Sequence, residues 1–326
     1  MKPYVFITRK IPEKLLTELY EMAEVKMWEH EDVPVPNDIL KEELERSDAV
    51  FSLVSDPIGS EQLSNCRNLK VIANMAVGYD NIDVELATSK GIVVCHTPDV
   101  LTDTTADLTF ALLLATARRI PEAAKYVKND EWSQWSPYLL AGTDVHHKTI
   151  GIVGMGRIGE AVARRAKGFD MNILYYNRSR KAVAEQEIGA QYCTFEDLLK
   201  QSDYVVCLAP LTPETKEIFN EKVFQQMKDS AIFINASRGG LVNESDLEEA
   251  LKNGVIKGAG LDVFAKEPIR ANHPLVQLPN VVAIPHIGSA TVETRDAMVK
   301  MTVQNIVRSL KGEQSIAAVN LKELGV

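Results

Sequence analysis

The chain has 326 residues, which exceeds the size at which one hydrophobic core usually keeps growing, so we expect two domains. Apolar residues make up 45% and charged residues 25%, as in ordinary globular proteins and unlike disordered or fibrous chains. The 36 Lys and Arg against 45 Asp and Glu give a formal net charge of −9, which repels a phosphate polyanion, so nucleic acid is not expected as a partner.

The cysteines and the apolar runs bear on the cell compartment. The four cysteines lie far apart without paired metal-ligand spacing, which predicts reduced thiols, no metal site and a cytoplasmic location. They are Cys66, Cys95, Cys193 and Cys207. The most apolar run, residues 110–117, is far shorter than the roughly 20 residues of a membrane span. We therefore expect no membrane partner, and the strand predicted directly after the first residues argues against an export signal.

Short apolar runs alternate with amphipathic segments over the first hundred residues. This alternation is typical of parallel βα units, in which strands buried on both faces are almost continuously apolar. The predicted strands cover residues 4–8, 25–28, 49–55, 69–75 and 91–97, and the predicted helices include 12–23 and 37–47. Residues 1–100 are thus expected to form a complete small α/β domain.

One long helix is predicted over residues 102–128. Its apolar positions Leu108, Ala111, Leu112 and Ala115 recur at helical spacing, and it could link two domains. A second βα series follows. Its predicted strands cover residues 149–154, 172–177, 204–210, 231–237, 258–264 and 281–288.

The last segment is predicted to return to the first domain. Thr291 can cap a helix that runs to Lys311, with Ala297, Met301 and Ile306 among its inward candidates. The predicted fold class is α/β, with two Rossmann-like or flavodoxin-like domains and parallel sheets. A substrate-binding domain would comprise residues 1–100 and 290–326, and a nucleotide-binding domain, residues 101–289, would be inserted into it.

Gly154, Gly156 and Gly159 form a GxGxxG pattern. The pattern follows a predicted apolar strand and opens an apolar-periodic helix, which is the context of dinucleotide-binding turns. The first glycine permits a tight turn, the second lets the backbone approach a pyrophosphate, and the third permits close packing of helix and strand. The N–H groups of the helix start then face the anion. A turn with only a structural role is the alternative.

The end of the next strand bears on the choice between NAD and NADP. NAD-specific sheets carry an acidic residue there, which accepts hydrogen bonds from the ribose hydroxyls. Here the strand ends in Asn177, 23 positions after Gly154. The next residues are Arg178, Ser179 and Arg180, so the turn lacks a carboxylate and offers partners to a 2′-phosphate. We therefore predict a preference for NADP(H), with NAD(H) as a possible cofactor. The alternative is that both arginines are ordinary solvent-exposed residues of a loop.

Three polar residues follow separate strands of the second series. Arg238 follows strand 231–237, Glu267 follows 258–264, and His286 ends the strand in VVAIPH. In open α/β sheets the ligand site lies at such carboxyl ends. Hydride transfer to a 2-oxo acid needs a cation for the carboxylate and ketone, an acid for the forming alkoxide, and a group that tunes the acid.

With these residues the chain resembles the D-isomer-specific 2-hydroxyacid dehydrogenases, and most closely their glyoxylate/hydroxypyruvate reductase branch. The resemblance covers nearly the whole length. The matching segments are residues 77–83, 151–159, 235–247, 258–268 and 272–291.

The resemblance implies a role for each catalytic candidate. Arg238 holds the carboxylate and carbonyl oxygens of the substrate, His286 donates the proton in reduction, and Glu267 bonds His286. A carboxylate beside an imidazole favours the charged ring, so reduction is expected to slow as the pH rises. The other histidines, His30, His96, His146, His147 and His273, have no comparable setting, and we take them as structural.

The resemblance also implies further contacts. The loop after the strand VIANM gives backbone N–H groups to the substrate carboxylate, which here maps to Ala76, Val77 and Gly78, with a plain glycine turn as the alternative. Apart from the resemblance, Leu53 is a candidate for the lining of the pocket, and a buried strand end is the alternative. Asp262 lies near the nicotinamide, and Thr105 and Asp107 begin the long helix near the same site. The full set of implied cofactor contacts is Thr105, Gly154, Gly156, Arg157, Ile158, Gly159, Asn177, Arg178, Ser179, Arg180, Ala209, Pro210, Thr215, Ala236, Ser237, Arg238, Asp262, His286 and Gly288.

The implied function is reduction of a small 2-oxo acid to its 2-hydroxy acid with NADPH, from glyoxylate to glycolate and from hydroxypyruvate to D-glycerate. Reductases of 2-ketogluconate, phosphoglycerate or lactate-type substrates are alternatives, since motifs do not give the width of the pocket. A nucleotide-sensing protein similar to the corepressors of this scaffold is the alternative from another class. Domain closure is expected to expel water.

Trp135 matches a tryptophan that in the resembling branch reaches from a dimer partner and closes the pocket. A core or interface aromatic is the alternative. A homodimer through the long helix, residues 102–128, is a separate hypothesis.

Overall fold

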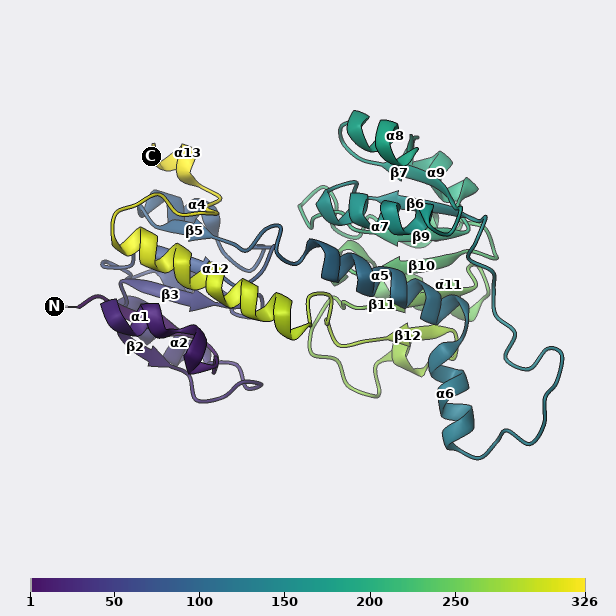
Figure 1. Cartoon of the computed structure of the whole chain (residues 1–326), viewed down its shortest axis with the longest axis horizontal. Coiled ribbons are helices and arrows are strands. Elements are labelled where there is room, and N and C mark those ends of the chain that lie inside the picture. Colours follow the sequence, from purple (N-terminus) through teal and green to yellow (C-terminus); the bar gives the residue numbers. More distant parts are fainter. Residues whose placement is uncertain (1, 326) are drawn as a thin grey trace. The chain divides into compact units, whose positions relative to one another are not determined.

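A computed structural model describes residues 2–325 of the chain. The chain divides into two compact units. The first runs to Leu101 and resumes at Ala290, so it is discontinuous in sequence, and the second runs from Thr102 to Ser289. Each unit contains one parallel sheet covered by helices (Figure 1). The predicted fold class is confirmed.

The first unit contains a five-stranded sheet in the order β2-β1-β3-β4-β5, and all its strands are parallel. This is the flavodoxin-like order. The strands are β1 (Tyr4–Ile7), β2 (Glu24–Met27), β3 (Ala49–Ser52), β4 (Val71–Asn74) and β5 (Val93–Cys95). The helices are η1 (Glu13–Leu15), α1 (Thr17–Met22), α2 (Asn37–Arg46), α3 (Ser60–Leu63), α4 (Val84–Ser89), α12 (Val292–Leu310) and α13 (Leu321–Leu324).

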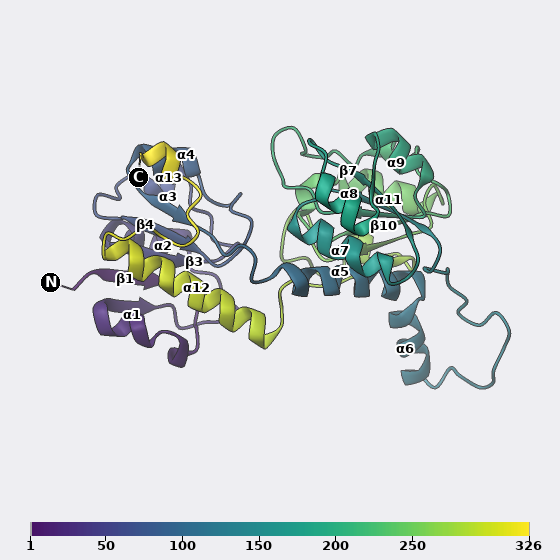
Figure 2. The ribbon, with the colours of Figure 1, turned by 45° about the horizontal axis from the view of Figure 1, so that its top comes forward.

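Helices cover both faces of this sheet (Figure 2). Four side chains in register across the sheet, Phe6, Val50, Ile72 and Val94, belong to the core beneath α2, α3 and α4. The opposite face lies under α12, which contacts β3 and β4 and packs beside α1. Successive side chains of a strand point to opposite faces of the sheet. The strand side chains on both faces of this sheet are apolar, as predicted from the continuous apolar runs.

The C-terminal segment completes this unit. Thr291 caps α12, because its Oγ1 accepts the N–H of Thr294 at 3.2 Å. Beyond the helix, the side chain of Asn320 accepts the N–H of Val94 and donates to the carbonyl of Ile92, both at 2.9 Å. Residues more than 220 positions apart are thereby joined at the edge of the sheet.

The second unit contains a seven-stranded parallel sheet in the order β12-β11-β10-β9-β6-β7-β8. The strands are β6 (Thr149–Val153), β7 (Asn172–Tyr176), β8 (Gln191–Tyr192), β9 (Tyr204–Cys207), β10 (Ile232–Asn235), β11 (Gly258–Leu261) and β12 (Val281–Ala283). The strand order reverses between β6 and β9, and ligands of such sheets bind at the carboxyl ends beside this point.

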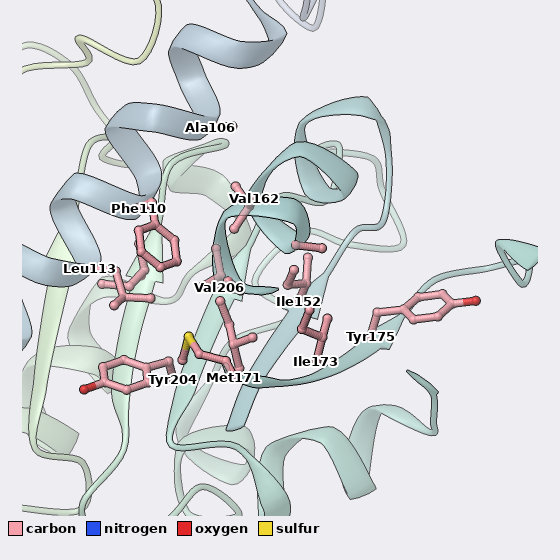
Figure 3. Packing of buried hydrophobic residues seen from close by; sticks show 14 of the residues in the cluster. Ala106, Phe110, Leu113, Ile152, Val162, Met171, Ile173, Tyr175, Tyr204 and Val206 are labelled. Atoms are coloured by element: carbon pink, nitrogen blue, oxygen red, sulfur yellow. The ribbon is translucent and has the colours of Figure 1, made fainter. Parts of the chain in front are cut away.

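Helices cover both faces of the second sheet as well. They are α5 (Thr102–Ala117), α6 (Ile120–Lys128), α7 (Arg157–Lys167), α8 (Ala182–Ile188), α9 (Phe195–Gln201), α10 (Glu221–Phe224), η2 (Gly239–Leu241), α11 (Glu244–Lys252) and η3 (Pro274–Gln277). On one face, Phe110 of α5 and Val162 of α7 pack toward Ile152 and Val206 of the sheet (Figure 3). This packing fixes the start of α7 at the end of β6.

The single helix predicted over residues 102–128 is wrong, because the chain forms two helices there. Arg119, between α5 and α6, has a left-handed φ of 54°. Pro121 follows in the first turn of α6, and in a continuous helix its ring would clash with the carbonyl of Ala117. That carbonyl accepts the N–H of Thr143 at 2.8 Å instead.

The apolar positions of this segment that recur at helical spacing do not all lie in the core. Leu112 is buried, but Ala111 is exposed. The buried face of α5 instead includes Ala106, Phe110 and Leu113. On α12, Ile306 is buried as expected, whereas Ala297 and Met301 are half-buried. The two-residue strand β8 was not predicted. No helix within residues 2–325 is both long and apolar enough to cross a membrane.

Candidate active site

The three glycines of the turn after β6 have distinct surroundings. Gly154 has a left-handed φ of 103°, and a Cβ there would lie 2.5 Å from the backbone nitrogen of Ala209. A Cβ on Gly159 would lie 2.4 Å from the carbonyl oxygen of Gly154. A Cβ on Gly156 would meet no atom within 4 Å, so the backbone is open where α7 begins. Arg157 and Ile158 form the first turn of that helix.

The turn after β7 holds the residues expected to select the cofactor. Asn177 donates its side-chain N–H to the carbonyl of Ser179 at 3.1 Å, which closes the turn. Arg178 is exposed, and its charge contributes, after the Thr212 hydroxyl, to lowering the pKa of Glu214. Arg180 differs, because two of its guanidinium nitrogens bond Glu185, at 3.0 and 2.6 Å.

The ends of β9 and β10 are tied together. Ser237 donates its hydroxyl to the carbonyl of Ala209 at 2.5 Å, while Ala236 beside it is buried. Thr215 closes the loop after β9 by donating to the carbonyl of Pro210 at 2.7 Å. The predicted cofactor residues of both strands therefore lie at one edge of the sheet, next to the glycine turn.

Arg238 leaves the sheet directly after this point. The side chain of Asn235, the last residue of β10, donates to the carbonyl of Arg238 at 2.9 Å. The next residue is Gly239, and a Cβ there would lie 1.8 Å from the carbonyl carbon of Phe264. Glycine is required at this position because the segment after β10 presses against the segment that leads to Glu267.

Glu267 and His286 form a hydrogen-bonded pair. Glu267 Oε2 lies 2.7 Å from His286 Nδ1, and Oε1 accepts the N–H of Phe264 at 2.9 Å. Burial raises the pKa of Glu267, but the bond to His286 and the charges of His286 and Arg238 outweigh it, so the pKa lies below its usual value. His286 has a left-handed φ of 52°, a conformation that costs a non-glycine residue energy and that often marks functional sites.

Asp262 lies behind this pair. Its Oδ1 accepts the N–H of Ile287 at 2.7 Å, whereas its buried Oδ2 has no hydrogen-bond partner in the part of the chain that the structure describes. Burial raises the pKa of Asp262 to about 6. A Cβ on Gly288 would lie 3.2 Å from Oδ2 and 3.4 Å from Cγ2 of the buried Thr105. A partly enclosed acceptor thus lies where β11, β12 and α5 meet.

Asp107, which was expected near the same site, is directed elsewhere. It is exposed on α5 and accepts a hydrogen bond from Nε of Arg165 at 2.6 Å. Of these two α5 residues, Thr105 lies beside Gly288, whereas the side chain of Asp107 bonds Arg165.

The predicted substrate residues of the first unit lie in two loops at the carboxyl ends of β3 and β4. Leu53 N–H bonds Oδ2 of Asp56 at 2.8 Å, and Ala76 is buried. The carbonyl oxygens of Val77 and Gly78 accept hydrogen bonds from side chains of the same unit. These loops therefore have a defined conformation.

Trp135 lies in the segment that follows α6. Its side chain is 78% exposed, so the alternative of a core aromatic is wrong. Trp132 and Tyr138 nearby are 59% and 87% exposed. In Figures 1 and 2, α6 and the segment after it extend away from the sheet. The base of this segment, residues 141–143, lines a cavity together with the first residues of β10, β11 and β12, at the edge opposite the catalytic candidates.

Two supporting residues were missed by sequence reasoning. Asn235 shapes the turn at Arg238, and Glu244 accepts the N–H of Ala265 at 2.8 Å, which anchors the segment before Glu267. Asn235 could have been recognised from the sequence, because it is a polar residue at the end of an otherwise apolar strand. No three His, Cys, Asp or Glu side chains among the described residues are grouped to hold a metal ion.

Comparison with known proteins gives consistent matches. The model of the NAD-binding domain of D-isomer specific 2-hydroxyacid dehydrogenases matches residues 110–288. A glyoxylate reductase of Thermococcus litoralis is 51% identical over 317 residues, covering 96% of this chain and 95% of that protein.

Solved structures agree. A protein of Thermus thermophilus has a TM-score of 0.90 at 42% identity, covering 97% of this chain and 99% of that chain. The NADPH-dependent glyoxylate/hydroxypyruvate reductase of Sinorhizobium meliloti, in complex with NADP and malonate, has a TM-score of 0.86 at 31% identity, covering 98% and 97%. The predicted resemblance is confirmed, and the chain belongs to the D-isomer specific 2-hydroxyacid dehydrogenase family of oxidoreductases.

Proposed function

We propose that the protein is an NADPH-preferring reductase that converts glyoxylate to glycolate and hydroxypyruvate to D-glycerate. The observation that carries the proposal is the Glu267–His286 pair at the strand ends that also present Arg238. Relatives named glyoxylate reductase at about half identity, and the reductase of Sinorhizobium meliloti that acts on both acids, support the choice of substrate.

His286 is assigned the proton that the keto oxygen gains. Since Nδ1 bonds Glu267, Nε2 is the ring atom left to face a substrate. The carboxylate fixes the orientation of the ring and favours its charged form, which holds the proton until an alkoxide forms. Arg238 is assigned the carboxylate and the carbonyl oxygen, because a guanidinium can bind two oxygens at once.

The residues fit a nicotinamide dinucleotide, which when bound supplies the hydride. The open backbone at Gly156 leaves room for a pyrophosphate at the start of α7. The unpartnered Oδ2 of Asp262 can accept an N–H of the nicotinamide carboxamide. The other predicted contacts at these strand ends are proposed in the same roles.

NADP preference is proposed from the turn after β7. Asn177 takes the place of an acidic residue, and Arg178 is exposed with no side-chain bond to a carboxylate within residues 2–325. Because Glu185 already binds Arg180, we assign the 2′-phosphate to Arg178 and Ser179.

A homodimer is proposed as the active form. The large exposed apolar side chains Ile120, Val127, Trp132, Trp135 and Tyr138 gather on α6 and the segment after it rather than on α5. The base of this segment lies at the edge of the sheet opposite its own catalytic residues. We therefore assign Trp135 to the substrate pocket of a second copy.

Turnover tests the proposed reaction. With NADPH, glyoxylate and hydroxypyruvate are expected to show the highest kcat/KM in a panel that includes 2-ketogluconate and pyruvate, measured by nicotinamide absorbance. Arg238→Lys keeps the charge but loses two-point binding, so kcat/KM is expected to fall by about 100-fold. Arg164→Lys, on the exposed side of α7, is the control. No turnover of any 2-oxo acid, or full activity of Arg238→Lys, contradicts the proposal.

The cofactor assignment is tested at the turn after β7. Arg178→Ala is expected to raise KM for NADPH by about tenfold or more, as for loss of a charged hydrogen bond, without changing KM for NADH. Arg180→Ala, whose guanidinium is held by Glu185, should have a smaller effect. A native chain that prefers NADH would overturn the assignment.

The pH dependence of reduction tests the carboxyl group behind His286. Since the pKa of Asp262 is raised by burial to about 6, this group is anionic above that pH and favours the charged ring of His286. In Asp262→Asn, single-turnover reduction is therefore expected to decline at lower pH than in the native chain. Asp107→Asn, at an exposed carboxylate of α5, is the control. Superimposable profiles of the native chain and Asp262→Asn speak against this coupling.

Heterodimers test the assignment of Trp135. Light scattering is expected to give the mass of two chains, and Trp135→Ala should raise KM for glyoxylate while Trp132→Ala does not. Refolding Trp135→Ala chains with Arg238→Lys chains should restore activity, because one site then combines a native Arg238 with a native Trp135. A monomeric mass, or a mixture no more active than its components, would rule out this arrangement.

A further inference from the structure

Three successive carbonyl oxygens of the loop after β4 are held by donors of the same unit. The carbonyl of Ala76 accepts the N–H of Thr97 at 2.8 Å. The carbonyl of Val77 lies 2.9 Å from Nδ1 of His96, and the carbonyl of Gly78 accepts from Nδ2 of Asn74 at 3.1 Å. The negative ends of all three peptide dipoles are thus engaged within the protein.

The N–H groups of the same loop differ in their bonding. Ala76 donates its N–H to the carbonyl of Asn74 at 2.8 Å. The N–H groups of Val77 and Gly78 form no hydrogen bond to any residue from 2 to 325. Two adjacent free donors beside fixed carbonyls form an anion-binding arrangement of the kind that a substrate carboxylate requires.

Asn81 ties this loop to the loop after β3. Its Nδ2 donates to the carbonyl oxygens of Leu53 at 3.1 Å and of Asp56 at 2.8 Å. Its Oδ1 accepts from Nδ2 of Asn74 at 3.2 Å, so one amide pair spans both loops.

The loop after β3 is in turn anchored by a buried charge pair. Asp56 lies 3.1 Å from Arg9, with side chains 2% and 6% exposed, and its Oδ2 accepts the N–H of Leu53. Removal of either partner would leave a buried charge unpaired, so the outer end of this network is rigid.

His96, which the sequence offered only as a structural histidine, follows β5 and lies against this loop. A carbonyl oxygen can only accept, so the contact to Val77 requires the hydrogen on Nδ1. The ring of Tyr79 packs edge-on against the imidazole at 5.6 Å between centroids, which limits its rotation. His96 is half-buried and does not belong to the residues assigned to catalysis.

We propose that His96, together with Asn74 and Asn81, is a positioning residue for the substrate carboxylate. The carbonyl of Val77 lies in the same peptide plane as the N–H of Gly78, so His96 directs this N–H to the anion, while Asn74 and Asn81 hold the loop on either side of it. The inference rests on the proposed function, because it concerns the acid that the reductase binds.

His96→Leu and His96→Asn form a matched pair for the test. Leucine fills similar space without a donor, whereas the amide nitrogen of asparagine can replace Nδ1. In His96→Leu, KM for glyoxylate is expected to rise about tenfold, as for the loss of one oriented hydrogen bond, and the affinity for malonate measured by calorimetry with bound NADP to fall equally. His96→Asn should restore both, and KM for NADPH should stay unchanged in each variant.

The outcomes separate this inference from the proposed function. If the native chain neither reduces glyoxylate nor binds malonate, the proposed function fails. If the native chain is active and His96→Leu has native values, the positioning role is wrong. A rise in both KM values with a lowered melting temperature would show a general structural role and also overturn it. Should His96→Leu not fold, Asn81→Ser carries the same test with the same expected pattern.

Discussion

The candidate chemistry depends on the hydrogen bond between Glu267 and His286, and this bond depends on the register of two parallel strands. Leu261 of β11 pairs with Ala283 of β12, and the N–H of Ile284 bonds the carbonyl of Leu261 at 2.9 Å. Both segments therefore leave the sheet at the same level, and beyond the strand ends Glu267 and His286 meet. A shift by one residue would turn the buried side chains of β11 or β12 to the other face, so the core of the sheet fixes the register on which this pair depends.

Several polar groups at these strand ends are arranged at a cost to stability. Asp262 keeps one oxygen buried without a hydrogen-bond partner among the described residues. His286 adopts a left-handed backbone conformation, which is unfavourable for any residue other than glycine. In the first unit, two adjacent N–H groups lack acceptors within residues 2–325, while the carbonyls of the same loop are engaged. Unpartnered groups of this kind are typical of a preorganised binding site, in which a charged ligand supplies the hydrogen bonds that the protein lacks.

The sequence predicted those features that have a local or periodic cause. Apolar runs predicted the strands of both sheets, and three glycines predicted the turn after β6. The strand ends indicated Glu267 and His286 as candidates, and the family resemblance implied the bond between them. The break between α5 and α6 was missed because one helical period continues across it, although Pro121 was a signal. The bond from His96 to Val77 and the pairing of Arg180 with Glu185 were not predicted, because each requires the positions of side chains across a turn. The place of Trp135 in an assembly depends on a second chain, which periodicity does not describe.

The central claim is that Nε2 of His286 and the guanidinium of Arg238 face one bound 2-oxo acid. A crystal structure with NADP and malonate, the pair present in the reductase of Sinorhizobium meliloti, tests it most directly. The account predicts carboxylate oxygens at hydrogen-bond distance, about 3 Å, from both side chains, with the bond between Glu267 and His286 intact. Malonate bound away from these residues, or a Glu267 turned from the ring, would contradict it.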